Sequence, residues 1–191
     1  MTRTTSNVLV DHFLEDRSAT RDFLWIVGFS LLTAVLAQVE IHLPFTPVPI
    51  TGQTLPVLLS GAVLGSRRAF ASQILYLAAG AAGMPVFAGG ASSPVYLFGP
   101  TGGYLWSFPL AAGLLGWLVE RGASRKWWRL VLALAVADTL ILVAGACWLS
   151  GLFRIPPGRA WLLGFYPFLI GDTLKVVVVG LSLPALLKRY E

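Results

Sequence analysis

The chain has 191 residues, of which 56% are hydrophobic and 12% charged, its net charge is +5, and its mean hydropathy is +0.75. Soluble domains carry about 25% charged residues, so too few charged groups remain here to cover a soluble surface. This composition excludes a soluble domain, a disordered chain and a coiled coil, and it predicts a membrane protein with several transmembrane helices.

Six apolar runs in the sequence are candidate membrane spans. A span needs about 20 mainly apolar residues, or fewer where other helices cover its ends. In chain order, the predicted spans are Phe23–Ile41, Thr54–Gly65, Ala69–Gly83, Gly103–Val119, Leu130–Leu152 and Pro167–Leu187. A short extra helical turn is expected at Ala160–Phe165. The sequence thus predicts an all-α fold with one six-helix membrane domain, residues 23–191, after a cytoplasmic N-terminal segment, residues 1–22.

The basic residues indicate how these spans are oriented. With the N-terminus in the cytoplasm, the outer loops contain Arg154 and Arg159, and Lys175 falls within a span. The rest of the 14 basic residues lie on cytoplasmic segments: Arg3, Arg17, Arg21, Arg67, Arg68, Arg121, Arg125, Lys126, Arg129, Lys188 and Arg189. This positive-inside distribution predicts that both termini are cytoplasmic. The basic residues form short clusters between apolar runs, which argues against a nucleic-acid partner.

Small residues recur at helical spacing in the first predicted span. Ser30 and Ala34 are four residues apart, and so are Thr33 and Ala37. This pattern lets a second helix approach closely within a membrane. That helix belongs either to another protein or to this chain, and the sequence leaves both possibilities open.

Two predicted outer loops are apolar where solvated loops would be polar. Residues 42–53 read HLPFTPVPITGQ, and residues 84–100 read MPVFAGGASSPVYLFGP. We expect both loops to pack on the protein as lids over a site, the alternative being ordinary structural connections.

Away from the span ends, three ionisable residues fall within predicted spans, where buried charge is costly and often functional. Asp172 and Lys175 are three residues apart, so they share one face of the sixth span. An Asp accepts N–H bonds and a Lys holds a carboxylate, so the pair suits a ligand with a urea-like edge and an acid tail. The alternative is a self-neutralising buried ion pair. Asp138, in the fifth span, is expected to be a buried acid without an assigned role.

Motifs for several other functions are absent from the sequence. No G-x-x-x-x-G-K-[ST] motif occurs, so the chain has no Walker loop for ATP hydrolysis. No His/Cys cluster occurs, so we expect neither a metal nor a cofactor. Asp138 and Asp172 could form an intramembrane aspartyl protease dyad, but Lys175 would favour ionised carboxylates over a shared proton. We therefore expect a protein that is not an enzyme.

Four motifs occur together along the chain. They are Pro47–Leu55 (PVPITGQTL), Gly80–Gly90 (GAAGMPVFAGG), Gly99–Tyr104 (GPTGGY) and Gly171–Lys175 (GDTLK). From about residue 25 to the end, their order and spacing resemble the BioY family, the biotin-binding S components of energy-coupling factor (ECF) transporters.

The resemblance implies a six-helix protein of the prokaryotic cytoplasmic membrane that binds biotin from the outside. It would release biotin inward when joined to a transmembrane T component and two ATP-binding subunits. An S component for another vitamin is the alternative. The small-residue face with Ser30, Ala34 and Ala37 would then contact the T component.

The resemblance also implies roles in binding biotin. Asp172 would accept from the ureido N–H groups, and Lys175 would hold the carboxylate. Gln53 would donate to the ureido oxygen, unless it caps the second span.

Further residues would contact biotin through its apolar parts or through the backbone. Gly90 and Ala91 would bring backbone groups close to the ligand, and Tyr104 and Phe87 would supply apolar walls. The chain departs from some relatives at Ala91, where a polar residue can stand, and at Leu105, where a basic residue can stand. One ureido contact and one carboxylate contact are therefore missing or supplied elsewhere.

Overall fold

The structure is a computed structural model that describes residues 19–187, without the side chains of residues 182–187. Most of the predicted segment 1–22 lies outside the described residues, as do the basic residues at both ends of the chain. The described part is mostly helical, as the sequence predicts.

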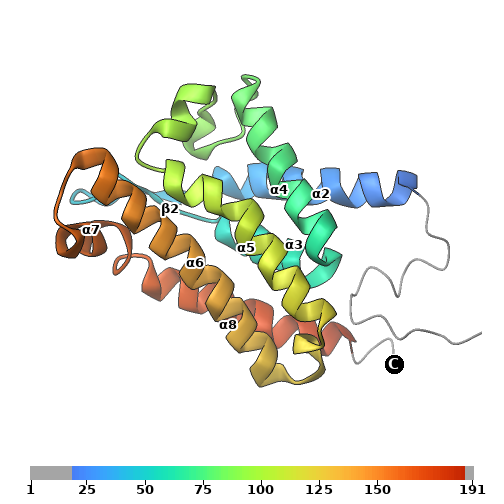
Figure 1. Cartoon of the computed structure of the whole chain (residues 1–191). Helices are drawn as coiled ribbons and strands as arrows, with labels where there is room; N and C mark the ends of the chain where they lie inside the picture. Colours follow the sequence, from blue (N-terminus) through green and yellow to red (C-terminus); the bar gives the residue numbers. More distant parts are fainter. Residues whose placement is uncertain (1–18, 188–191) are drawn as a thin grey trace, which may run out of the picture.

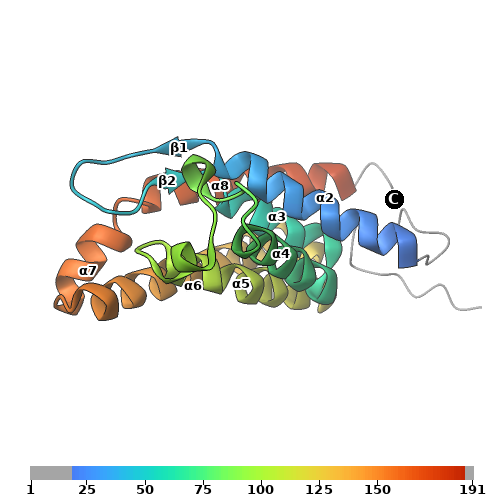
Figure 2. The same ribbon diagram turned by 90° about the horizontal axis from the view of Figure 1, so that it is seen from above.

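Seven helices in the described residues build the fold (Figure 1). They are α2 (Ala19–Ala37), α3 (Thr54–Leu64), α4 (Ser66–Ala81), α5 (Gly102–Glu120), α6 (Trp127–Phe153), α7 (Pro157–Gly164) and α8 (Leu169–Leu187). Figure 2 shows two layers, with α2 and α8 on one side, α4, α5 and α6 on the other, and α3 between them.

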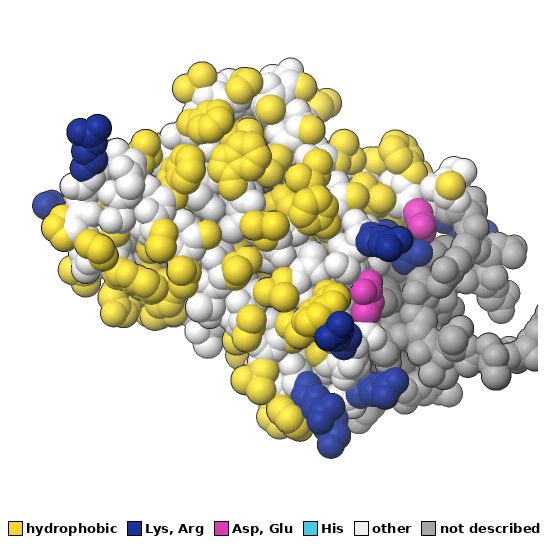
Figure 3. All heavy atoms as spheres, in the orientation of Figure 1, with side chains coloured by type: hydrophobic (Ala, Val, Ile, Leu, Met, Phe, Trp, Pro, Cys, Tyr) yellow, Lys and Arg dark blue, Asp and Glu magenta, His cyan; other side chains and the backbone are white. Residues whose placement is uncertain are grey.

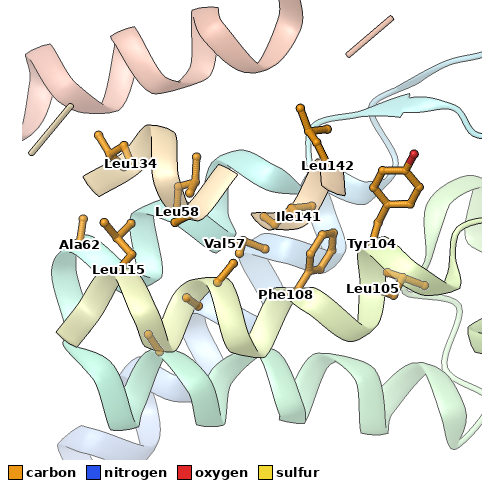
Figure 4. Close-up of a cluster of buried hydrophobic side chains, with 14 of the residues drawn as sticks. Val57, Leu58, Ala62, Tyr104, Leu105, Phe108, Leu115, Leu134, Ile141 and Leu142 are labelled. Atoms are coloured by element: carbon orange, nitrogen blue, oxygen red, sulfur yellow. The ribbon is translucent and has the colours of Figure 1, made fainter. Parts of the chain in front are cut away.

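Helix α3 lies at the centre of the bundle and contacts α2, α4, α5, α6 and α8. Its approach to α5 is close, because a Cβ atom at Gly61 would lie 2.7 Å from the carbonyl oxygen of Ala112. Such contacts between small residues are typical of packed membrane helices. Figure 4 shows the resulting core, which includes Val57, Leu58 and Ala62 from α3, Leu115 from α5, and Leu134 and Ile141 from α6.

Each of the two apolar loops contains short elements of secondary structure. The first forms a small hairpin in which β1 (Glu40–Ile41) pairs antiparallel with β2 (Ile50–Thr51). Near the tip of this hairpin, the Thr46 hydroxyl donates to the carbonyl oxygen of Leu163 at 2.7 Å, which ties the loop to α7. The second loop contains the 3-10 helices η1 (Ala88–Gly90) and η2 (Pro94–Phe98).

The predicted elements differ from the helices mainly at their boundaries. The first predicted span was expected to reach Ile41, but α2 ends at Ala37 because Glu40 and Ile41 pair with β2. The expected turn at Ala160–Phe165 is the longer helix α7.

The length and composition of the helices account for fewer than six membrane crossings. By these criteria α2, α5 and α6 each suffice to cross a membrane, and α7 with α8 adds a fourth crossing if this pair, which is bent by 54°, is one broken span. Helix α3, with 11 residues, is shorter than a usual span. The chain is thus an apolar helical membrane protein, and the count of six remains a prediction.

Candidate binding site

A pocket lies where the two apolar loops meet the starts of α3, α5 and α8 and the middle of α6. Its empty volume, including the space at its mouth, is about 470 Å³. The lining residues come from both outer loops and four helices: Val48, Pro49, Thr51, Gln53, Thr54, Ala88, Tyr96, Thr101, Tyr104, Leu105, Phe108, Leu142, Phe168, Asp172 and Lys175. Both predicted loops therefore contribute to one site.

A charged pair from α8 forms the polar centre of the pocket. The Lys175 Nζ donates to the Asp172 carboxylate at 2.7 Å, so the predicted shared face is confirmed. The same ammonium donates to the Thr54 hydroxyl at 2.7 Å and to the carbonyl oxygen of Thr51 at 2.8 Å. Thr54 in turn donates to the Asp172 carboxylate at 3.0 Å. With Asp172 2% exposed, this network satisfies charges that would be costly to bury alone.

The charged pair lies at the start of α8, where this helix borders the pocket. The chain bends between α7 and α8, and Asp172 stands in the first turn of α8. A helix N-terminus favours negative charge, so Asp172 occupies a position suited to a carboxylate. Lys175 follows on the same face and reaches across to the segment before α3.

Gln53 belongs to the same polar region. Its side-chain amide donates to the Tyr76 hydroxyl at 2.6 Å and accepts from the Thr51 hydroxyl at 3.0 Å. It precedes α3, but its side chain makes no capping hydrogen bond. The capping alternative is thus not what the structure shows, and Gln53 lines the pocket.

Aromatic and aliphatic side chains form the opposite wall. Figure 4 shows Tyr104, Leu105, Phe108 and Leu142 at the end of the core that borders the pocket. The Tyr104 hydroxyl donates to the carbonyl oxygen of Gly164 at 2.5 Å, so its polar tip is already used by the chain. Leu105 confirms that this wall presents no basic side chain at that position.

Tyr96 adds a polar group to this wall. Burial raises the pKa of its hydroxyl above its ordinary value, which already lies well above neutral pH. Thr101 lies beside it in the lining. Neither residue was singled out from the sequence, because an apolar loop gives no periodic signal for which side chain faces a cavity.

Three predicted contacts in the second loop lie outside the pocket lining. Phe87 is fully buried behind the wall, where its ring stacks on Tyr96 at 5.1 Å between ring centroids. Gly90 and Ala91 follow it, and Ala88 is the residue of this stretch that lines the pocket. The structure thus places Phe87 as a support for Tyr96.

Gln38, which the sequence analysis overlooked, fixes this stretch to the end of α2. Its side-chain amide donates to the carbonyl oxygen of Phe87 at 3.1 Å and accepts from the Gly90 backbone N–H at 3.0 Å. Gln38 is a polar residue in the last turn of the first predicted span. That position is the signal from which its role in holding a loop could have been predicted.

The small-residue face of α2 packs inside the chain. Ser30 is 6% exposed, Ala37 is fully buried and Ala34 packs on the core. The neighbouring Thr33 hydroxyl donates to Gln73 of α4 at 3.3 Å. The internal alternative therefore fits the structure, and a T-component contact through these residues stays a prediction.

Asp138 lies in α6, 7% exposed, with one carboxylate oxygen unpartnered among the described residues. Asp172, by contrast, is held by Lys175 and Thr54. This is the arrangement of an ion pair and not of two acids that share a proton, so no observation favours the protease alternative.

Comparison with known proteins adds independent evidence. Residues 4–191 match the model of the BioY family. The chain is 36% identical over 160 residues to "Biotin transporter BioY2" of Lactococcus lactis, covering 84% of this chain and 86% of that one. It is 37% identical over 163 residues to "Biotin transporter BioY" of Thermotoga maritima, covering 85% and 93%.

A solved structure shows the same fold. The S-component for biotin from an ECF-type ABC transporter superposes with a TM-score of 0.83 at 23% sequence identity, covering 91% of this chain and 95% of that chain.

Proposed function

Because this chain belongs to the BioY family, we propose that it is the biotin-binding membrane subunit (S component) of an ECF-type vitamin uptake transporter. The observation that carries the proposal is the Thr54–Asp172–Lys175 network at one side of a mostly apolar pocket. Relatives covering most of this chain are named biotin transporters, and such a protein needs no catalytic group.

The chemistry of biotin matches the two walls of the pocket. Its ureido ring carries two N–H donors and a carbonyl, its thioether ring is apolar, and its side chain ends in a carboxylate. Asp172 accepts from the ureido N–H groups, and Gln53 donates to the ureido oxygen. Lys175 holds the carboxylate in exchange for one of its three present bonds, to Thr51, Thr54 or Asp172. Tyr104 contacts the apolar ring. Gly90, Ala91 and Phe87 act from behind the lining by shaping the second loop.

The membrane arrangement is part of the proposal. Helices α3 and α4 complete six crossings, and α3 tolerates its short length because other helices surround it. Both termini are cytoplasmic, so the pocket opens to the outside. Residues 23–191 form one domain. Biotin is released inward when the chain joins a transmembrane T component and two ATP-binding subunits.

Biotin titration of the full chain in lipid nanodiscs tests the ligand and the site. We expect tight biotin binding and no binding of thiamine or riboflavin. Asp172→Asn and Lys175→Ala should each weaken binding by about 1.5–3 kcal/mol, the value of a hydrogen bond to a charged group. Arg154→Gln, on the surface beyond α6, is the control and should bind like the unmodified chain.

The outcomes separate the alternatives. Binding of another vitamin in place of biotin would make the chain an S component of different specificity. Unchanged affinity in both site variants would remove the site assignment. Labelled-biotin uptake by cells with and without the ATP-binding subunits tests the partners.

A further inference from the structure

A second, shallower groove lies at the opposite end of the bundle from the pocket. It runs beside the turn between α5 and α6, and its empty volume, open side included, is about 670 Å³. The residues that matter for its chemistry are Leu118, Arg121, Arg129, Leu132, Ala133 and Val136. Figure 3 shows Lys and Arg side chains gathered at this end, next to a hydrophobic flank.

Two arginines border the groove. The Arg121 guanidinium lies 3.8 Å from the centroid of the Trp117 ring, and that of Arg129 lies 5.2 Å from the Trp128 ring. Both arginines are exposed. In the described part of the chain, no carboxylate forms an ion pair with either. The groove therefore offers two positioned guanidinium groups that can pair with an external anion.

The rest of the groove is apolar and follows a single face of α6. Arg129, Leu132 and Val136 recur at helical spacing, so they form a stripe that begins with a cation and continues with aliphatic side chains. Leu132 is 57% exposed and Val136 53% exposed. A soluble anion would contact the arginines but not the aliphatic side chains. A molecule with an anionic head and a hydrocarbon tail can contact both.

We propose that this groove binds one anionic phospholipid of the surrounding bilayer. The headgroup phosphate pairs with Arg121 and Arg129, because guanidinium groups form bidentate hydrogen bonds with phosphate oxygens. An acyl chain lies along Leu132 and Val136. The exposed tryptophans beside the arginines mark the level of the membrane interface. The proposal rests on the membrane character of the chain and is independent of the ligand in the pocket.

Competition between lipids in nanodiscs tests this site. The full chain is reconstituted with equal amounts of phosphatidylglycerol and phosphatidylcholine, and the lipids retained after mild detergent extraction are identified by native mass spectrometry. We expect phosphatidylglycerol to be retained preferentially. The double variant Arg121→Gln/Arg129→Gln should reduce this preference about tenfold or more, as expected for removing two basic residues at an anionic membrane surface.

A matched control separates a site from general charge. The double variant Arg154→Gln/Arg159→Gln removes the same charge at the other end of α6 and should retain the preference. Circular dichroism checks that both variants stay helical. Equal retention in the groove variant and the unmodified chain would overturn the proposal, as would an equal loss in the control. Complete displacement of lipid by soluble glycerol phosphate would also overturn it, because an anion alone would then suffice.

Discussion

The two walls of the pocket are built on different principles. On the wall formed by α8 and the start of α3, polar groups bond to one another and still face the cavity, as Lys175 and Thr54 show. On the wall formed by α5 and α6, most side chains are aromatic or aliphatic and the Tyr104 hydroxyl is used by Gly164, so Tyr96 of the second loop adds the main polar group there. The first wall can therefore recognise charge and hydrogen-bonding groups, whereas the second recognises shape.

The largest effect should follow from removing the cation of the polar wall. Lys175→Met leaves the buried Asp172 carboxylate without its ion pair, and breaking one side of such a pair costs about 3–5 kcal/mol of stability. The free energy of unfolding, measured by titrating detergent-solubilised protein with a denaturing detergent, checks this. The double variant Asp172→Asn/Lys175→Met has no uncompensated carboxylate, so it should recover part of the lost unfolding free energy. No recovery would show that Lys175 does not compensate the charge of Asp172.

Overpacking the shape-recognising wall should have the next largest effect. A Cβ atom at Gly145 would clash with the ring of Tyr104, so Gly145→Ala should destabilise the protein by about 1–3 kcal/mol. The control is Gly151→Ala in the same helix, where nothing lies within 4 Å of the added Cβ. A similar unfolding free energy for both variants would contradict the close contact.

A smaller effect is expected when the shared hydroxyl of the polar wall is removed. Thr54→Val keeps the shape but loses the bonds to Lys175 and Asp172, so biotin affinity should fall by about 1 kcal/mol. The binding titration described above measures this. Thr33→Val removes another buried hydroxyl, outside the pocket lining, and should leave biotin affinity unchanged. Equal losses of affinity in both variants would mean that the effect of Thr54→Val does not come from the pocket.

The smallest change in binding should come from Tyr104→Phe. Its hydroxyl bonds to Gly164 rather than to the cavity, so stability should fall by about 1 kcal/mol while biotin affinity stays nearly constant. Measuring both quantities on one preparation sharpens the contrast with Thr54→Val. A loss of affinity as large as that of Thr54→Val would place this hydroxyl among the ligand contacts.

Part of the polar wall could be predicted from helical periodicity. Residues three apart on a helix share a face, and two charges in an apolar run attract attention, so the Asp172–Lys175 pair could be predicted. Thr51 and Thr54 could not, because they become partners only when α8 packs on α3, a contact that local sequence does not encode.

The second outer loop shows the opposite case. Phe87 and Gly90 were expected at the ligand, yet the structure brings Ala88, Tyr96 and Thr101 to the pocket. A loop stabilised by tertiary bonds such as those of Gln38 has no fixed period, so its inward-facing residues cannot be read from spacing. The burial of Ser30 and Ala37 likewise depends on which helix α2 meets.

The bond between Thr46 and Leu163 has a mechanical consequence for this molecule. It joins the hairpin tip to α7, and α7 leads through the bend into the helix that carries Lys175. A swing of the hairpin must therefore either break this bond or pull on α7. While the bond holds, any displacement of the hairpin tip is passed to α7 and, through the bend, to the start of α8.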